Sequence, residues 1–361
     1  ILYTFIYKRL YFIHSLIIII SCLFRNIRLY SFYTSKILHK NETTKQLTSF
    51  RLYKIIFLIK CIEKKEFFCH STLLFVPLHF VRIPIMTEGL VSVIMPTYNT
   101  VDFLADSIES ILNQTYTNLE LLITDDCSSD KNTIDLLNKY AQKDDRVKLA
   151  FLKDNLGPGV ARNNAIERAQ GQYIAFCDSD DRWMPNKLEL QIAAMKNGGY
   201  TLCCSSYIIC DENNNNIGIN ISPQHITFSM MKRDNKVGCL TAIYDIRALG
   251  RKYYMPKIRK RQDWALFLEI ISNCHNAYGI KEPLAYYRKR VNSVSSNKIA
   301  LIKYNIAVYR QCLHFGKFKS LAYFAFCFLP SYTAKVIKQK IDSLTGRFHT
   351  FLPCHSDLHR M

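Results

Sequence analysis

Four groups of polar residues in the middle of the sequence could carry chemistry, and each follows a short apolar run. They are P-T-Y-N at 96–99, D-D-C-S-S-D at 125–130, N-L-G-P-G-V-A-R-N at 155–163 and D-S-D-D at 178–181. Carboxylates gathered in this way repel one another unless a cation or hydrogen-bond donors offset their charge. Hard divalent cations prefer oxygen ligands, which Mg2+ and Mn2+ usually share between carboxylates and substrate phosphates. The residue types are therefore those of a site for a phosphorylated ligand and a divalent cation.

Each group taken alone has a simpler explanation. Asp126 and Asp130 are typical of turns and helix caps, and Arg162 would fit a solvated helix surface. A D-x-D triplet is common by chance, and the glycines at 157 and 159 lack the third glycine of a dinucleotide-binding fingerprint. The order and spacing of the four groups together favour one site.

Apolar runs and helical spacing place these groups at the ends of strands. Strands are predicted at 90–95 (stopped by Pro96), 119–124, 147–152 and 173–177, and helices at 101–113, at 158–169 and after Pro185. Ser128 or Ser129 is expected to cap a further helix. Such alternation is typical of βαβ units, and so of a mostly parallel sheet with helices on both faces. Ligands of these sheets bind outside the carboxyl ends of the strands, where the four groups would meet.

The second half of the sequence has weaker signals. Residues 200–210 followed by the Asn-rich turn at 213–216 predict a β-hairpin, and 237–244 another strand. R-K-R-Q-D-W at 259–264 precedes an apolar helical run. By position alone, Asp263 is a first-turn helix residue that the helix dipole favours.

Charge and cysteine content bound the partners. With 48 Lys and Arg against 29 Asp and Glu, the net charge is +19, which suits nucleic acid, a phosphorylated ligand or an anionic membrane surface. No nucleic-acid-binding motif is present, so we expect no nucleic-acid partner. The 13 cysteines form no C-x-x-C pair, which favours reduced thiols of a cytoplasmic protein and no zinc site.

Residues 1–85 differ in composition from the rest of the sequence. They contain no Gly, Ala, Asp or Met, and three acidic residues against 13 Lys and Arg. We expect this segment to be an upstream translation artefact, with the working domain beginning near Met86. The alternative is a membrane anchor or disordered segment, because residues 11–24 are apolar with basic flanks, although shorter than a spanning helix.

As a set, V-S-V-I-M-P-T-Y-N, E-L-L-I-T-D-D-C-S-S-D, N-L-G-P-G-V-A-R-N and Y-I-A-F-C-D-S-D-D-R-W resemble family 2 glycosyltransferases of the GT-A fold. The resemblance covers about 91–290, and Cys127 stands where the family usually has Gly. It implies a GT-A type α/β fold: a Rossmann-like, mostly parallel sheet flanked by helices, a smaller acceptor-side β/α region and a C-terminal helical tail. The expected boundaries are 86–295 for the glycosyltransferase domain (nucleotide-binding half about 90–200, acceptor half about 200–295) and 296–361 for a basic tail.

The resemblance also implies roles on the donor side. Thr97 and Tyr98 would line the base and ribose pocket, and Asp126 would hydrogen-bond the base. Arg162 and Asp178 would contact the nucleotide.

Two further roles concern the reaction itself. Asp180, with Asp178, matches the DxD motif and would hold Mn2+ or Mg2+. Asp263 in Q-D-W would be the general base that takes the proton of the acceptor hydroxyl. One displacement without a covalent intermediate would invert the anomeric configuration.

The implied function is a metal-dependent, inverting hexosyltransferase that uses a nucleotide-sugar, by expectation a UDP-sugar, and a glycan or lipid-linked saccharide in bacterial polysaccharide biosynthesis. Residues 315–341 mix aromatic residues with lysines, as in a helix on an anionic membrane or one packed on the domain. The expected location is cytoplasmic, at the inner face of the cytoplasmic membrane. Two alternatives stay open: a catalytically inactive nucleotide-sugar binding protein, against which Asp180 and Asp263 argue, and a sugar-phosphate nucleotidyltransferase, whose glycine-rich first loop P-T-Y-N does not resemble.

Overall fold

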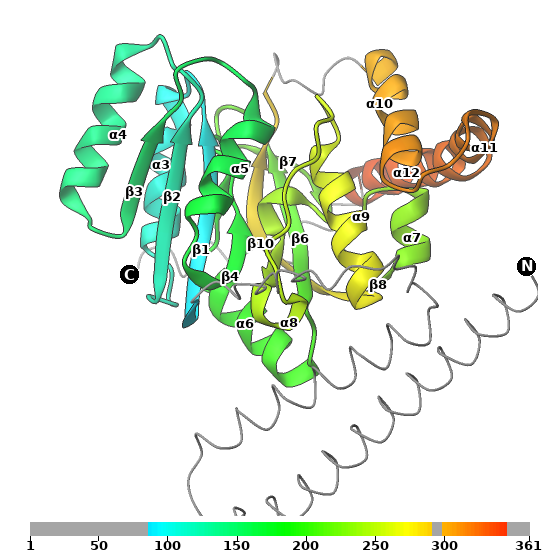
Figure 1. Ribbon diagram of the computed structural model, residues 1–361, viewed down its shortest axis with the longest axis horizontal. Coiled ribbons are helices and arrows are strands. Elements are labelled where there is room, and N and C mark those ends of the chain that lie inside the picture. Colours follow the sequence, from blue (N-terminus) through cyan, green and yellow to red (C-terminus); the bar gives the residue numbers. More distant parts are fainter. Residues whose placement is uncertain (1–85, 291–297, 345–361) are drawn as a thin grey trace, which may run out of the picture. The chain divides into compact units, whose positions relative to one another are not determined.

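The computed structural model describes residues 86–290 and 298–344, which belong to one compact unit. The expectations for residues 1–85 lie outside the described residues. A ten-stranded mixed sheet runs through the unit in the order β3-β2-β1-β4-β9-β6-β10-β5, with β7 beside β6 and β8 beside β10 (Figure 1). The sheet positions every loop discussed below.

The strands are β1 (Thr87–Thr97), β2 (Leu119–Asp125), β3 (Val147–Phe151), β4 (Gly171–Phe176), β5 (Arg182–Trp183), β6 (Leu202–Cys210), β7 (Asn216–Asn220), β8 (His225–Thr227), β9 (Ile243–Asp245) and β10 (Asn276–Arg288). The helices are α3 (Val101–Leu112), α4 (Lys131–Lys143), α5 (Pro158–Arg168), α6 (Lys187–Gly198), α7 (Phe228–Arg233), the 3-10 turn η1 (Cys239–Thr241), α8 (Ile246–Leu249), α9 (Gln262–Cys274), α10 (Lys298–Gln311), α11 (Lys317–Tyr323), the π-helical turn η2 (Phe324–Phe328) and α12 (Leu329–Leu344).

The first half is the predicted succession of parallel βαβ units. β3, β2, β1 and β4 are parallel neighbours, and β1 pairs with β2 from Val91–Leu119 to Thr97–Asp125, so their carboxyl ends coincide. Alternate residues of β1 point to opposite faces. Val93 packs in one core with α3, α4 and α6, whereas Ile94 packs in the other with α5 and α9. Helices therefore cover both faces, as the sequence pattern indicated.

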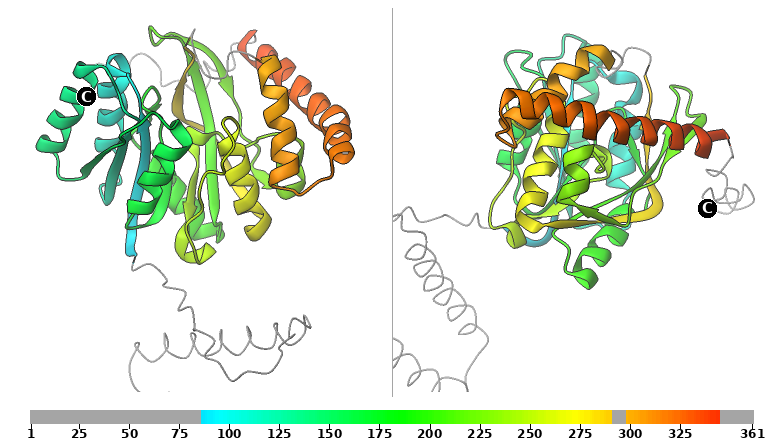
Figure 2. Two further views of the ribbon diagram at one scale, coloured as in Figure 1. Left: turned by 45° about the horizontal axis from the view of Figure 1, so that its top comes forward. Right: turned by 90° about the vertical axis from the view of Figure 1, so that its right-hand side faces the viewer.

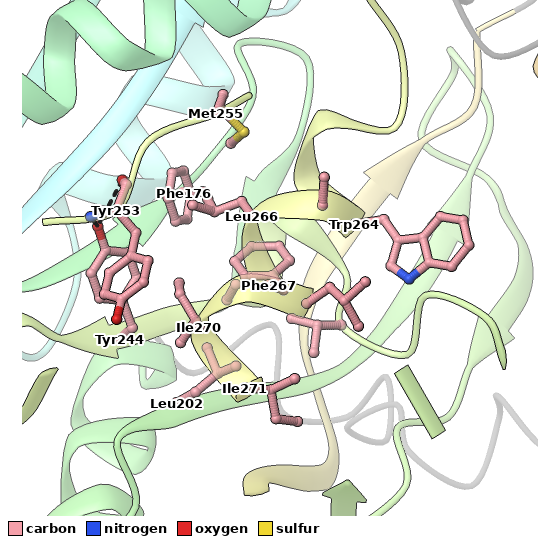
Figure 3. Close-up of a cluster of buried hydrophobic side chains, with 14 of the residues drawn as sticks. Phe176, Leu202, Tyr244, Tyr253, Met255, Trp264, Leu266, Phe267, Ile270 and Ile271 are labelled. Atoms are coloured by element: carbon pink, nitrogen blue, oxygen red, sulfur yellow. Dashed lines mark hydrogen bonds between the residues drawn. The ribbon is translucent and has the colours of Figure 1, made fainter. Parts of the chain in front are cut away.

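The second half continues the sheet with antiparallel pairs. β9 pairs antiparallel with both β4 and β6, whereas β6 and β10 are parallel. The Asn-rich turn joins β6 and β7 into the predicted hairpin. The core between the sheet and α9 is aromatic. The Phe267 ring of α9 meets Phe176 of β4 edge-on, with ring centroids 5.8 Å apart, and Phe176 also packs on Tyr244 of β9 (Figure 3). The helix that carries Asp263 is thereby anchored to the nucleotide-binding half.

The C-terminal helices pack on this second half (orange to red in Figures 1 and 2). Trp264, directly after Asp263, lies between the rings of Tyr309 in α10 and Phe328 in η2, at centroid distances of 5.6 and 5.5 Å. The expected helical tail therefore contributes side chains to the core. In the part of the chain that the structure describes, one helix, Lys317–Asp342, is long and apolar enough to cross a membrane by length and composition.

Three details of the predicted elements are wrong. The strand expected to stop before Pro96 continues through it to Thr97. A parallel strand bonds each neighbour through alternate residues only, so the missing N–H of the proline does not end the pairing. Asp130, not Ser128 or Ser129, caps α4, since its carboxylate accepts from the backbone N–H groups of residues 132 and 133. The strand expected at 237–244 is a turn, η1, followed by the short β9.

Candidate active site

The loops that follow β1 and β2 are tied to each other at the carboxyl edge of the sheet. The Asn99 backbone N–H donates to Ser128 Oγ at 2.9 Å, and Asn99 Oδ1 accepts from the N–H groups of Ser129 and Asp130 at 3.0 Å each. Thr97 is buried, and its hydroxyl pairs with that of Thr100 at 2.8 Å. Tyr98 is 44% exposed, so its ring is free to line a pocket.

The Asp126 carboxylate connects the loop after β2 with the start of α5. Its two oxygens accept from the backbone N–H groups of Leu156 (2.9 Å) and Gly157 (2.8 Å). Gly157 has φ +93, which other residues rarely adopt, and Pro158 suits the first helical turn that follows. Asp126 is 3% exposed, so a contact with a nucleotide base would use the remaining lone pairs of oxygens that already accept one hydrogen bond.

Arg162, one turn into α5, meets Asp178 after β4. Its Nη2 donates to Asp178 Oδ1 at 2.5 Å. Burial lowers the pKa of the Arg162 guanidinium, but the charges of Asp178 and, more weakly, Asp263 outweigh it, so the pKa is raised and the group stays charged. Among the described residues, the buried Arg162 Nε has no hydrogen-bond partner. Buried donors are rarely left unpaired in proteins, so this N–H is one that a bound water or ligand would be expected to satisfy.

Asp180 lies in the same region, and its surroundings disfavour the ionised form of its carboxyl group. Burial and the charge of Asp178 raise the pKa of the Asp180 carboxyl, and Arg290, at 3.4 Å, offsets the effect in part. Asp181 is instead inside the protein, where its carboxylate accepts from the Arg288 N–H at 3.0 Å. A divalent cation would stabilise ionised Asp180, and carboxylate oxygens are the ligands that Mg2+ and Mn2+ prefer, so the residues fit such an ion.

The protein would supply few ligands to that ion. Among residues 86–290 and 298–344, no group of three or more His, Cys, Asp or Glu side chains is arranged to hold a metal. Asp178 is already paired with Arg162, which leaves Asp180 as the more available of the two predicted ligands. The remaining positions would fall to phosphate oxygens and water, as is usual for Mg2+.

Asp263 lies beside this group although it is distant in sequence. It is the second residue of α9, and its charge acts on both Arg162 and Cys239. The preceding side chain, Gln262, packs so closely on Gly159 that a Cβ there would overlap its amide. The first turns of α5 and α9 are therefore in contact, and the charge of Asp263 in the second half acts on the Arg162–Asp178 pair.

The structure also brings in residues that the sequence pattern did not indicate. Asn235, in the loop after α7, donates to Asp263 Oδ2 at 3.0 Å, and Arg290 reaches Asp180. Cys239 lies near Arg162, Asp178 and Asp263. Asn235 lies in a loop without periodicity and Cys239 within the run predicted as a strand, so no local signal marked either as part of a site.

Comparisons with known proteins identify the family of the chain. Residues 92–256 match the family model described as Glycosyl transferase family 2. The chain is 38% identical over 257 residues to the putative teichuronic acid biosynthesis glycosyltransferase TuaG of Bacillus subtilis. The aligned residues cover 70% of this chain and 98% of TuaG. It is also 38% identical over 219 residues (60% of this chain, 84% of the relative) to WfgD of Escherichia coli, a UDP-Glc:alpha-D-GlcNAc-diphosphoundecaprenol beta-1,3-glucosyltransferase.

Among solved structures, the chain is similar to S. aureus TarS 1-349 in complex with UDP, with a TM-score of 0.49 and 19% identity over 65% of this chain and 72% of that one. The sheet order and the family match confirm the expected GT-A type α/β fold. The expected activity, transfer of a sugar from a nucleotide-sugar to a glycan or saccharide acceptor, is likewise that of the matched family and relatives. The chain therefore belongs to glycosyltransferase family 2.

Proposed function

We propose that this protein is a metal-dependent, inverting hexosyltransferase that moves a sugar from a UDP-sugar to a hydroxyl of a lipid-linked saccharide. The names of two relatives support the substrates: WfgD uses UDP-Glc and a diphosphoundecaprenol-linked acceptor, and TuaG acts in teichuronic acid biosynthesis. The observation that carries the proposal is the position of Arg162. It pairs with Asp178, and the negative charge of Asp263 helps to raise its pKa.

On the donor side, Thr97 and Tyr98 line the base and ribose pocket, and Asp126 bonds the base. Arg162, whose Nε has no partner among the described residues, and Asp178 contact the nucleotide. Asp180, with Asp178, would hold Mn2+ or Mg2+, which would supply positive charge for the departing diphosphate. The donor thus occupies the carboxyl edge of β1, β2 and β4.

On the acceptor side, Asp263 takes the proton from the acceptor hydroxyl while the oxygen attacks the anomeric carbon. A positioned general base contributes about 10²–10⁴ in rate. The nucleoside diphosphate leaves from the opposite face, so the configuration inverts. In this scheme residues 90–200 bind the nucleotide and residues 200–295 bind the acceptor. The expected start of the tail at 296 lies outside the described residues.

We also propose that the protein lies on the anionic inner face of the cytoplasmic membrane. The helix Lys317–Asp342 buries Phe324 and Phe328 against the core but leaves Phe318 and Phe326 exposed, at 88% and 81%. Lysines flank this exposed apolar strip. One packed face and one free apolar face suit a helix that lies in the interface better than one that spans it.

The metal role is tested with Asp180→Ala. We expect donor binding to lose its dependence on Mn2+ or Mg2+ and transfer to fall by roughly 10²-fold or more, because the diphosphate charge is no longer offset. Isothermal titration with UDP, with and without the ion, and transfer assays over UDP-, GDP- and dTDP-sugars provide the measurement. Metal-dependent UDP binding equal to that of the wild type would refute this assignment.

The base is tested with Asp263→Asn. The amide keeps the size of the side chain but cannot accept the proton, so turnover should fall by about 10²–10⁴-fold while the UDP dissociation constant stays close to the wild-type value. Full turnover in this variant would show that another group is the base.

A further inference from the structure

Asn235 has one defined orientation next to Asp263. Its Oδ1 accepts from the Val237 backbone N–H at 3.1 Å, so its Nδ2 faces Asp263 Oδ2, at 3.0 Å. Turning the amide over would bring an NH2 group against the Val237 N–H and an oxygen against the carboxylate. Both contacts would be repulsive, so the hydrogen-bond network itself assigns the amide.

The loop that carries Asn235 is held by α12. Lys335 Nζ donates to the Asn235 backbone carbonyl at 3.1 Å and lies 3.7 Å from the buried carboxylate of Asp234. From the other side, Lys236 Nζ pairs with Asp234 at 3.1 Å and donates to Ser331 Oγ of α12 at 3.3 Å. Asp234 is 3% exposed, and these two lysines are paired with it at the base of the loop.

The same C-terminal segment also packs against the residue that follows Asp263. Phe328 of η2 and Tyr309 of α10 enclose the Trp264 ring, and the Tyr309 hydroxyl donates to the Lys232 carbonyl at 2.9 Å. The first turn of α9 is thus fixed by the ring on one side and by the Asn235 amide on the other. In Figure 2 these C-terminal helices run beside α9, far in sequence from the donor loops.

We propose that Asn235 is a positioning residue for the base Asp263, and that Lys335 of α12 holds Asn235 in place. The inference rests on the proposed function of Asp263 and extends it to Asn235, within the matched residues 92–256, and to Lys335 of α12, beyond them. A single hydrogen bond to one carboxylate oxygen restricts rotation of the carboxyl plane, and it keeps the other oxygen free for the acceptor hydroxyl. Small errors in such geometry can cost roughly 10²-fold in rate.

The first test is Asn235→Asp, in the full chain. The new side chain is isosteric and still accepts from the Val237 N–H, but it replaces the N–H donor at Asp263 with a second carboxyl group, which opposes ionisation of the base. We expect kcat for transfer to fall roughly 10- to 100-fold, with the donor KM and the UDP dissociation constant within about twofold of wild type. Asn138→Asp makes the same change of charge on the exposed face of α4, and it should behave as wild type.

The second test is Lys335→Met, with Lys335→Arg as the conservative variant. Loss of the bond to Asn235 should lower kcat several-fold at unchanged donor KM, and arginine should restore most of it. Lys338→Met removes an exposed lysine of the same helix and should leave transfer to a water-soluble acceptor unchanged.

The outcomes separate the two levels of the proposal when Asp263→Asn is measured in the same assay. If Asp263→Asn retains turnover, the base assignment itself is wrong. If Asp263→Asn is inactive but Asn235→Asp has wild-type kcat, Asn235 serves the loop alone and the positioning role is overturned. If Asn235→Asp is impaired while Lys335→Met matches wild type, α12 has no part in positioning the base.

Discussion

At the scale of single residues, three of the six described non-glycine residues with positive φ lie where chemistry is expected. Asn99 and Cys127 belong to the polar groups after β1 and β2, and Arg261 directly precedes α9; their φ values are 49, 64 and 67. Such conformations cost of order 1–3 kcal/mol each and persist where surrounding contacts impose them. Cys127 stands where the family usually has glycine, and its left-handed conformation gives the physical reason for that preference.

Replacement of Cys127 tests this explanation. Cys127→Gly should raise the free energy of unfolding by about 0.5–1 kcal/mol, because relief of the strained φ exceeds the entropy that glycine loses on folding. Cys127→Val should lower it by about 1 kcal/mol or more, since a β-branched residue tolerates this φ least. Urea unfolding curves of the three proteins provide the measurement, and a destabilised glycine variant would contradict the explanation.

At the scale of elements, the first residue of α6 is a lysine whose amine is buried among apolar side chains. Lys187 is fully buried, its Nζ donates to Gln191 Oε1 at 2.7 Å, and it lies 3.8 Å above the Trp183 ring. Burial lowers the pKa of Lys187 to about 7. Cysteines 177, 203 and 204 surround it and raise that pKa only in part.

This buried amine should make stability depend on pH. Between about pH 7 and the ordinary lysine pKa, the unfolded chain holds the proton and the folded chain does not, so the free energy of unfolding rises with pH, by at most about 1.4 kcal/mol per unit. Below pH 7 both states are protonated and the full cost of burial remains. Lys187→Met should be more stable at pH 7 and show a smaller slope between pH 7 and 8.5, measured by denaturant unfolding. An unchanged slope would show that Lys187 titrates elsewhere.

At the scale of the whole molecule, the donor loops and the C-terminal helices meet at the first turn of α9. The Lys317–Asp342 helix presents Phe318 and Phe326 to solvent while its other face supports Trp264. A membrane-bound acceptor would therefore approach the protein near the Lys317–Asp342 helix, which packs beside the proposed base Asp263.

Membrane attachment through this helix is tested by replacing its two exposed phenylalanines and measuring binding to lipid vesicles. The double change Phe318→Ser and Phe326→Ser should weaken binding to vesicles with anionic lipids by at least about tenfold, because each buried aromatic side chain contributes about 1.5–3 kcal/mol. Vesicle co-sedimentation measures it, and binding should fall further as salt rises. Ile217→Ser, an exposed residue of the β6–β7 hairpin, is the matched control. Unchanged binding of the double variant would exclude this surface.

The sequence by itself determined the parallel half of the fold and the identity of the family. Strand and helix periods are local properties, so alternation along 90–198 was enough to place the polar groups after β1, β2 and β4. The short β9 and the turn η1 were misread as one strand because an apolar run of that length does not reveal whether it is paired.

Only the tertiary structure decided which side chains meet. Arg162 and Asp178 are 16 residues apart, Asn235 and Asp263 are 28 apart, and Lys335 lies 100 residues from the carbonyl it bonds. No periodicity extends over such separations, because these contacts follow from how α5, α9 and α12 pack on the sheet. Spacing along the chain shows where a polar side chain leaves the backbone, whereas its partner and charge state depend on the neighbours that folding brings to it.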